Sequence, residues 1–197
     1  GTKVLVEITS ESGEIKEVDL ERRSVDLRPV RTKRLRNDSH TIGYLRITQF
    51  SESVPKKFEE ALQELREKDV EGLILDLRNN SGGLVSSGIA VADSLLSERP
   101  IVETKNRNGI KDAITSQKDT SFDGPMVTLV NKGTASASEI LAGSLQDNGR
   151  SILMGEKTYG KGLIQSLKSL GNDSGIAITV ASYISHSKRQ QHMVVDT

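Results

Sequence analysis

The fold class follows most directly from Gly72-Leu73-Ile74-Leu75-Asp76-Leu77, because this segment is a short and nearly continuous apolar run. Such a run is typical of a β-strand that is covered on both faces, as in the parallel sheets of α/β proteins. Before it, apolar residues from Phe58 to Leu65 recur at the i, i+3, i+4, i+7 spacing of a helix, with Ser53 as a candidate cap and Pro55 in the first turn. After it, residues 84–96 alternate small and apolar residues at helical spacing.

Strand-like and helix-like segments alternate along the rest of the chain. Residues 41–50 predict a strand before the first helix, Met126–Val130 predict a second buried strand, and residues 136–146 predict a helix that leads to a strand at 151–154. This order predicts an α/β fold, a mixed sheet with a parallel centre and flanking helices. We expect 163–167 and 175–183 to be antiparallel edge strands of that sheet, because both alternate in polarity.

Two further segments have the pattern of extended structure. Residues 101–104 predict a strand that turns back at Asn108-Gly109, a dipeptide favoured in hairpins. Lys3–Ile8 and Ile15–Leu20 predict another hairpin around Ser12-Gly13.

The segment from Arg22 to Ser39 is basic and polar, which indicates a solvated linker or an edge strand, or else a patch for an acidic partner. We expect a domain boundary there.

Composition excludes several classes of function. The 197 residues contain 27 basic and 27 acidic side chains, so no global field favours nucleic acid or an anionic membrane. No run approaches the roughly 20 apolar residues of a membrane span. The chain has no cysteine, which excludes disulfides and thiol catalysis, and its three histidines lack metal-ligand spacing, so we expect no metal site. The start, Gly1-Thr2-Lys3, has neither an initiator methionine nor a signal-peptide pattern, so we expect the chain to be an internal piece of a longer protein.

Ser136 is the candidate nucleophile. It lies among small residues, Gly133-Thr134-Ala135-Ser136-Ala137, between a predicted strand and a predicted helix. A helix N-terminus presents unpaired N–H groups and a positive dipole end, which would stabilise a tetrahedral oxyanion, and the N–H of Ala137 is the candidate donor. The alternative is that these serines only cap a helix. The Gly-x-Ser-x-Gly pattern is absent, which disfavours an α/β-hydrolase.

A glycine pair follows the decisive strand, in Asn79-Asn80-Ser81-Gly82-Gly83. Ligands of α/β sheets bind beyond the carboxyl ends of strands, so this loop and the Ser136 loop could line one crevice. Gly82 would then supply the second oxyanion N–H. An ordinary glycine turn is the alternative.

Lys161 is the candidate general base, since it lies between two glycines that would let the backbone pass close to the serine. A lysine acts as a base only when it is neutral, which requires burial or nearby positive charge to lower its pKa from about 10.4. Gln165 lies four residues later and would share a face with Lys161 if the strand extends that far. Its carbonyl oxygen could orient the amine without adding charge.

Nucleotide binding is the rival interpretation of the same region. Gly155-Glu156-Lys157-Thr158-Tyr159-Gly160-Lys161 matches seven positions of a phosphate-binding loop. The eighth residue is Gly162 instead of Ser or Thr, and a strand pattern follows where a helix is required, so the sequence disfavours this interpretation.

Four motifs together resemble the carboxyl-terminal processing peptidases of family S41: Leu75 to Gly83, Gly133 to Ile140, Gln146 to Arg150 and Thr158 to Gln165. The resemblance runs from about Ile42 to Tyr183. It implies a serine endopeptidase, without a cofactor, that cuts near the C-terminal tails of protein substrates. By this resemblance Ser136 is the nucleophile, Lys161 the base and Gln165 its orienter. Gly82 and Ala137 match the oxyanion positions, and Glu139 and Asp147 match positions that support the site.

The resemblance also implies a domain order: residues 1–25 as the last strands of a PDZ domain, 26–41 as a linker or edge segment, and 42–197 as the protease core. The residues within these motifs are similar to those of the photosynthetic branch, whose enzyme matures a photosystem II precursor. That implies an extracytoplasmic location, the thylakoid lumen, with a bacterial periplasm as the alternative. Ser81 stands where the family commonly has proline, and the segment after Tyr183 lacks the family's usual Pro-x-Gly.

A non-catalytic or autoinhibited module that binds peptide tails is the competing hypothesis, because a β-rich groove binds tails by strand addition.

Overall fold

The computed structural model describes residues 1–23, 28–37, 39–117, 119–172 and 174–185. These residues form eleven strands and three helices: β1 (Lys3–Thr9), β2 (Ile15–Glu21), β3 (Val30–Arg36), β4 (Thr41–Ile47), α1 (Val54–Arg66), β5 (Gly72–Asp76), α2 (Val85–Asp93), β6 (Pro100–Asn106), β7 (Gly109–Thr115), β8 (Met126–Val130), α3 (Ala137–Asp147), β9 (Ile152–Gly155), β10 (Leu163–Gly171) and β11 (Ser174–Ile184).

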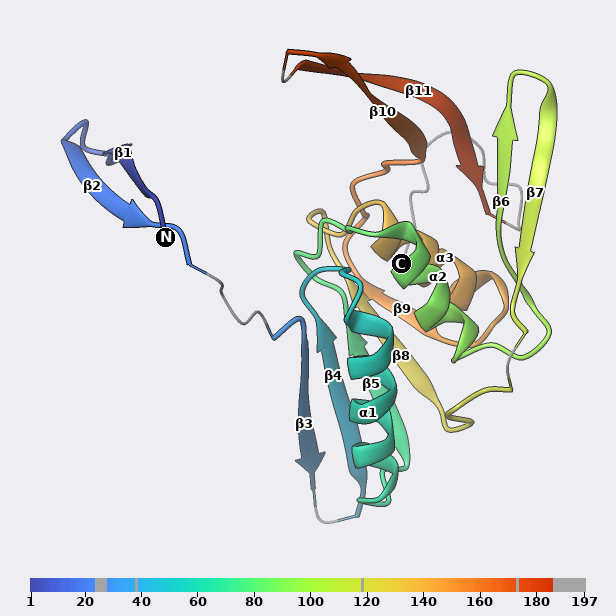
Figure 1. The fold of residues 1–197 in the computed structure, drawn as a ribbon. Helices are drawn as coiled ribbons and strands as arrows, with labels where there is room; N and C mark the ends of the chain where they lie inside the picture. The colour runs from blue at the N-terminus through green and yellow to red at the C-terminus, as the bar shows by residue number, and fades with distance from the viewer. Residues whose placement is uncertain (24–27, 38, 118, 173, 186–197) are drawn as a thin grey trace.

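A five-stranded sheet in the order β3-β4-β5-β8-β9 forms the centre of the fold (Figure 1). Strands β4, β5, β8 and β9 are parallel, and β3 is an antiparallel edge strand. Each parallel strand follows its neighbour in chain order, and crossover connections are almost always right-handed. The three crossovers therefore place α1, α2 and α3 on one face, where α1 packs on α2 and α2 packs on α3.

The core lies between this helix layer and the sheet. Phe58, Leu62 and Leu65 are buried on the sheet side of α1, as their helical spacing predicts. Leu73 and Leu75 of β5 are buried as well, and Asp76 at the end of the strand has no exposed surface. Pro55 lies in the first turn of α1, while Ser53 is the N-cap residue without a side-chain capping bond.

The strands that we expected at the edges of the central sheet belong to a second sheet. Strands β10, β11, β6 and β7 form an antiparallel sheet in that order. Asn106 pairs with Gly109 across the predicted hairpin turn. The α/β assignment, a mixed sheet with a parallel centre and flanking helices, is thus confirmed, but the strands at 163–167 and 175–183 lie in a separate sheet instead of at its edges. Alternation of polar and apolar residues identifies a strand with one buried face, but it does not identify the strand with which it pairs.

The predicted N-terminal hairpin forms, since β1 pairs with β2 from Lys3↔Glu21 to Thr9↔Ile15. It is a two-stranded sheet of its own. Two strands do not show a PDZ domain, so the assignment of residues 1–25 stays a prediction. Of the basic segment that follows, residues 30–36 form the edge strand β3, which is one of the two structures that its composition indicated. No helix in the described ranges is long and apolar enough to cross a membrane. His186, His192 and the rest of the tail after Ser185 lie outside the described residues.

Candidate active site

Ser136 lies at the junction of β8 and α3 in a strained backbone conformation. Its φ is 57° and its ψ is −118°, close to the values of about +60° and −120° of the first central residue of a type II′ turn. Glycine usually occupies that conformation, and a side chain in it carries a cost that folded proteins retain mainly at functional sites. The sequence lacks Gly-x-Ser-x-Gly, yet the chain makes the sharp strand-to-helix turn that presents a nucleophile.

Ser136 is the N-cap residue of α3 and forms a capping box with Glu139. The Ser136 N–H donates to Glu139 Oε2 at 2.8 Å. In the other half of the box the Glu139 N–H lies at the Ser136 side chain, and it also donates to the Ser136 carbonyl oxygen at 2.9 Å. The Ala137 N–H makes no hydrogen bond to any described residue. A half-buried hydroxyl therefore lies beside an available donor.

The carboxylate of Glu139 joins the Ser136 loop to the Lys161 loop. Glu139 is fully buried. Its Oε2 accepts the N–H of Ser136 at 2.8 Å and the N–H of Lys161 at 2.9 Å. Its Oε1 accepts the N–H of Gly160 at 2.6 Å and the hydroxyl of Thr158 at 2.7 Å. One buried charge thus fixes the backbone of the candidate nucleophile against the backbone of the candidate base, and its four donors compensate for its burial.

These contacts also explain the partial phosphate-loop pattern. The N–H groups of Gly160 and Lys161 do hold an anionic group, but that group is the carboxylate of Glu139. The chain continues from Lys161 into strand β10, with no helix N-terminus at this point. Nucleotide binding by this loop is therefore not supported.

The side chains of Lys161 and Gln165 are both exposed, and neither makes a hydrogen bond to Ser136 or to the other. Strand β10 begins at Leu163, so Lys161 precedes it and does not share a strand face with Gln165 as we expected. An irregularity in pairing between Ile164 and Gln165 further separates the two. The structure thus joins the backbone of Lys161 to the site through Glu139, while its exposed side chain makes no hydrogen bond to Ser136.

Gly82 lies directly against the nucleophile. A Cβ at this position would be 2.8 Å from Ser136 Cβ and 2.8 Å from the carbonyl oxygen of Ala135, and φ is +100°, so only glycine fits. The N–H of Gly82 donates to Asn80 Oδ1 at 3.0 Å. The expected second oxyanion donor is therefore next to Ser136 but engaged, and it would have to exchange this partner for an oxyanion.

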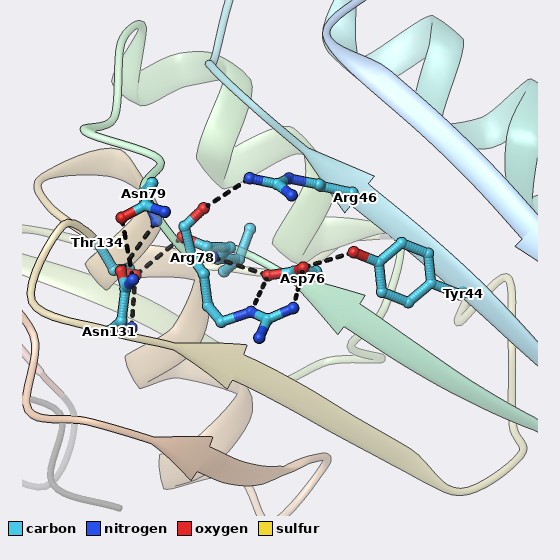
Figure 2. A network of polar contacts seen from close by, with 8 residues as sticks. Tyr44, Arg46, Asp76, Arg78, Asn79, Asn131 and Thr134 are labelled. Carbon is cyan, nitrogen blue, oxygen red and sulfur yellow. Dashed lines mark hydrogen bonds and ion pairs between the residues drawn. The ribbon is translucent and has the colours of Figure 1, made fainter.

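The glycine loop is bound to the Ser136 loop by amide and hydroxyl side chains (Figure 2). Asn79 and Asn131 exchange two hydrogen bonds, of 2.9 and 3.0 Å. Thr134 Oγ1 donates to the carbonyl oxygen of Leu77 at 2.8 Å. Asn80 is fully buried, and its carbonyl oxygen accepts the N–H of Ala135 at 3.0 Å. Hydrogen bonds therefore join the two loops that the sequence predicted to lie together.

An ion pair fixes the start of the glycine loop (Figure 2). Arg78 donates to Asp76 through Nε at 3.0 Å and through a terminal nitrogen at 2.8 Å, and its backbone N–H also donates, at 2.9 Å. The Tyr44 hydroxyl donates to the same carboxylate at 2.5 Å. Burial acts to raise the pKa of Asp76, but these hydrogen bonds and the charge of Arg78 outweigh it and hold the pKa below its usual value. Burial, followed by the bond to Asp76, raises the pKa of Tyr44.

Stability should therefore fall in acid through Asp76. A carboxylate whose pKa is depressed on folding stabilises the protein above its unfolded pKa, and this contribution disappears as pH falls through the folded pKa, below about pH 4. Asp76→Asn should lower the free energy of unfolding at pH 7 by about 2 kcal/mol, since one oxygen no longer accepts, and it should flatten the acid limb. Urea unfolding at pH 7 and pH 3 measures both. Equal acid dependence in the variant and the wild type would contradict the role of Asp76.

Other candidates lie outside the site. Asp147 is the last residue of α3, about 15 Å along the helix from Ser136, so the structure does not bring this expected supporting residue to the nucleophile. His40 is exposed and pairs with Glu71 at 2.7 Å. Within the described ranges, no group of three or more His, Cys, Asp or Glu side chains could hold a metal ion.

Sequence reasoning missed Tyr44, Asn80, Asn131 and Thr134 as parts of the site. A signal was available for two of them, because Asn80 and Asn131 each follow a predicted parallel strand, and the carboxyl ends of such strands meet at one edge.

Comparison with known proteins identifies the family of the chain. Residues 41–195 match the family model described as peptidase family S41. The chain belongs to peptidase family S41. This S41 chain is 50% identical over 186 residues to the carboxyl-terminal-processing protease of Synechocystis sp., an alignment that covers 92% of this chain and 43% of the relative. It is 40% identical over 202 residues to the chloroplastic carboxyl-terminal-processing peptidase 3 of Arabidopsis thaliana, covering 95% of this chain and 38% of that protein.

Among solved structures, the S41 chain superposes on the photosystem II D1 C-terminal processing protease with a TM-score of 0.80 and 33% identity, covering 99% of this chain and 54% of that one. The resemblance to the processing peptidases, including their photosynthetic branch, is confirmed. The chain spans about two-fifths of the length of these two curated relatives.

Proposed function

We propose that this protein is a serine endopeptidase that cuts polypeptides near their C-termini. The observation that carries the proposal is the strained Ser136, whose half-buried hydroxyl lies beside an Ala137 N–H without a partner among the described residues and whose backbone is joined to Lys161 through Glu139. The substrate class comes from the relatives, which are named as carboxyl-terminal processing enzymes.

The chemistry assigns one step to each group. Neutral Lys161 takes the proton of the Ser136 hydroxyl as Oγ attacks the scissile carbonyl carbon, and the protonated amine later gives a proton to the leaving amine. The N–H of Ala137, with that of Gly82 after it leaves Asn80, stabilises the oxyanion. Water then attacks the acyl-enzyme with Lys161 again as the base. Gln165 orients the amine once it has turned inward.

Activation requires only side-chain and local loop movement. Glu139 already fixes the backbone of Lys161, so rotation of its exposed side chain brings the amine toward Ser136. Gly82 contacts Ser136 and needs only to release Asn80. An autoinhibited or purely peptide-binding module is the second candidate, and the lack of a hydrogen bond between Lys161 and Ser136 favours it.

An extracytoplasmic location, in a thylakoid lumen or a periplasm, is part of the proposal, because the relatives include chloroplastic and cyanobacterial enzymes. The proposed partners are the C-terminal tails of protein substrates. A PDZ domain ending in β2 would present such tails.

Mass spectrometry of an unstructured polypeptide incubated with the protein tests the activity. We expect fragments that lack only a short C-terminal segment, and covalent labelling of Ser136 by a fluorophosphonate that blocks their appearance. Cleavage without Ser136 labelling would assign the activity to another group. Binding of the polypeptide with neither cleavage nor labelling would favour the peptide-binding module.

A further inference from the structure

A cavity adjoins the glycine loop. It has a volume of about 540 Å³ and is lined by the loop between β4 and α1, from Gln49 to Ser53, together with Gly83 and Leu84. Leu84 is 44% exposed although it is apolar, whereas the side chain of Phe50 is buried in the core. The exposed apolar surface of this cavity therefore comes largely from Leu84. Leu84 thus presents apolar surface to solvent two residues from Gly82, which lies against the candidate nucleophile.

The backbone between this cavity and Ser136 has unused hydrogen-bonding groups. Phe50 forms a parallel bridge with Gly83, in which the Phe50 N–H donates to the carbonyl oxygen of Gly82 at 2.9 Å and the Leu84 N–H donates to the carbonyl oxygen of Phe50 at 3.0 Å. In such a bridge the N–H and C=O of Gly83 itself point to the opposite side. Neither makes a hydrogen bond within the described part of the chain, and Gly83 is exposed.

The two features are continuous with the reaction centre. Gly82 contacts Ser136, and Gly83 is one residue further, about 3.8 Å along the chain. An extended polypeptide that places its scissile carbonyl at Ser136 would therefore pass the free edge of Gly83. The side chain of the residue that pairs there would meet Leu84.

We propose that Gly83 and Leu84 form a substrate subsite, in which Gly83 pairs with the backbone of one substrate residue within two positions of the scissile bond, and Leu84 contacts an apolar side chain of that residue or its neighbour. This subsite rests on the proposed peptidase function and adds a specificity-determining residue to it. Backbone pairing orients an extended substrate of any sequence, while the apolar wall selects among side chains. The subsite selects against charged side chains, because they would lose water against Leu84.

A peptide panel tests the subsite. In each peptide one position, from three residues before the cut to three residues after it, is Ala, Leu or Asp. The value of kcat/KM is measured for every peptide. We expect one position within two residues of the cut at which Leu exceeds Asp by about tenfold or more. Leu84→Ala should reduce this ratio several-fold at that position alone, and Leu84→Lys should reverse it. Ile152→Ala, which removes a 69% exposed apolar side chain from β9, is the matched control and should leave every ratio unchanged.

A binding measurement tests the subsite independently of peptide cleavage. Ser136→Ala protein should bind the Leu peptide more tightly than the Asp peptide, and Leu84→Ala should remove this difference. Replacing the substrate N–H that faces Gly83 by an ester oxygen should weaken binding about fivefold. If the wild-type protein cleaves no peptide but binding still depends on Leu84, the peptidase function is refuted and the subsite is retained. Cleavage with ratios that Leu84 does not affect would refute the subsite and retain the peptidase.

Discussion

Lys161→Met is expected to lower kcat for peptide cleavage by about 10⁴-fold, with the fold unchanged. Methionine keeps most of the length of the side chain and removes the amine of Lys161, whose backbone N–H donates to Glu139. Ser136→Ala should cause a loss of similar size, because the nucleophile and its base act as one unit. The double variant should be no less active than either single variant. Initial rates on a C-terminally extended unstructured substrate measure all three.

Lys132→Met is the matched control, since Lys132 is exposed in the loop that precedes Ser136 and makes no described side-chain contact. It should retain full activity. Thermal unfolding should give the same midpoint for the Lys161 variant as for the wild type, because the exposed amine has no hydrogen-bond or ion-pair partner among the described residues. A Lys161→Met protein with undiminished kcat would show that another group removes the hydroxyl proton.

Glu139→Gln is expected to lower kcat by about 10²-fold with little change in KM. Each carboxylate oxygen accepts two donors, so the amide of glutamine can satisfy either Ser136 and Lys161 or Gly160 and Thr158, but its NH₂ group must then face the other pair. The two loops would be held less firmly in relation to each other. The free energy of unfolding should fall by about 3 kcal/mol, because buried donors lose their acceptor.

Glu156→Gln is the control for the loss of one negative charge, because Glu156 is exposed and near the same loop. It should change neither kcat nor stability by a measurable amount. If Glu139→Gln destabilises the protein and leaves kcat intact at a temperature where it is fully folded, Glu139 holds the structure without positioning the reactants. A change in KM without a change in kcat would also argue against a role of Glu139 in positioning the reactants.

The sequence predicted the parts of this fold that depend on local pattern. The apolar run at 72–77 and the helical spacing from Phe58 to Leu65 gave strand β5 and helix α1, because burial on two faces and on one face leave different periodicities. The candidate residues Ser136, Ala137 and Gly82 also meet, since strand ends at one sheet edge share a crevice.

The remaining features depend on contacts that no local pattern contains. Alternation at 163–167 and 175–183 predicted strands correctly but could not reveal that β11 pairs with β6 in a separate sheet. The capping-box spacing of Ser136 and Glu139 predicts a helix start, but the extra donors from Gly160 and Lys161 arrive from a loop more than twenty residues away. Asp147 is the opposite case, because it lies on the same helix as Glu139 but at the far end of that helix from Ser136.

Glu139 couples the turn before β10 to the start of α3, because one carboxylate oxygen accepts the backbone N–H groups of Lys161 and Ser136. A displacement of that turn is therefore transmitted to the backbone of Ser136.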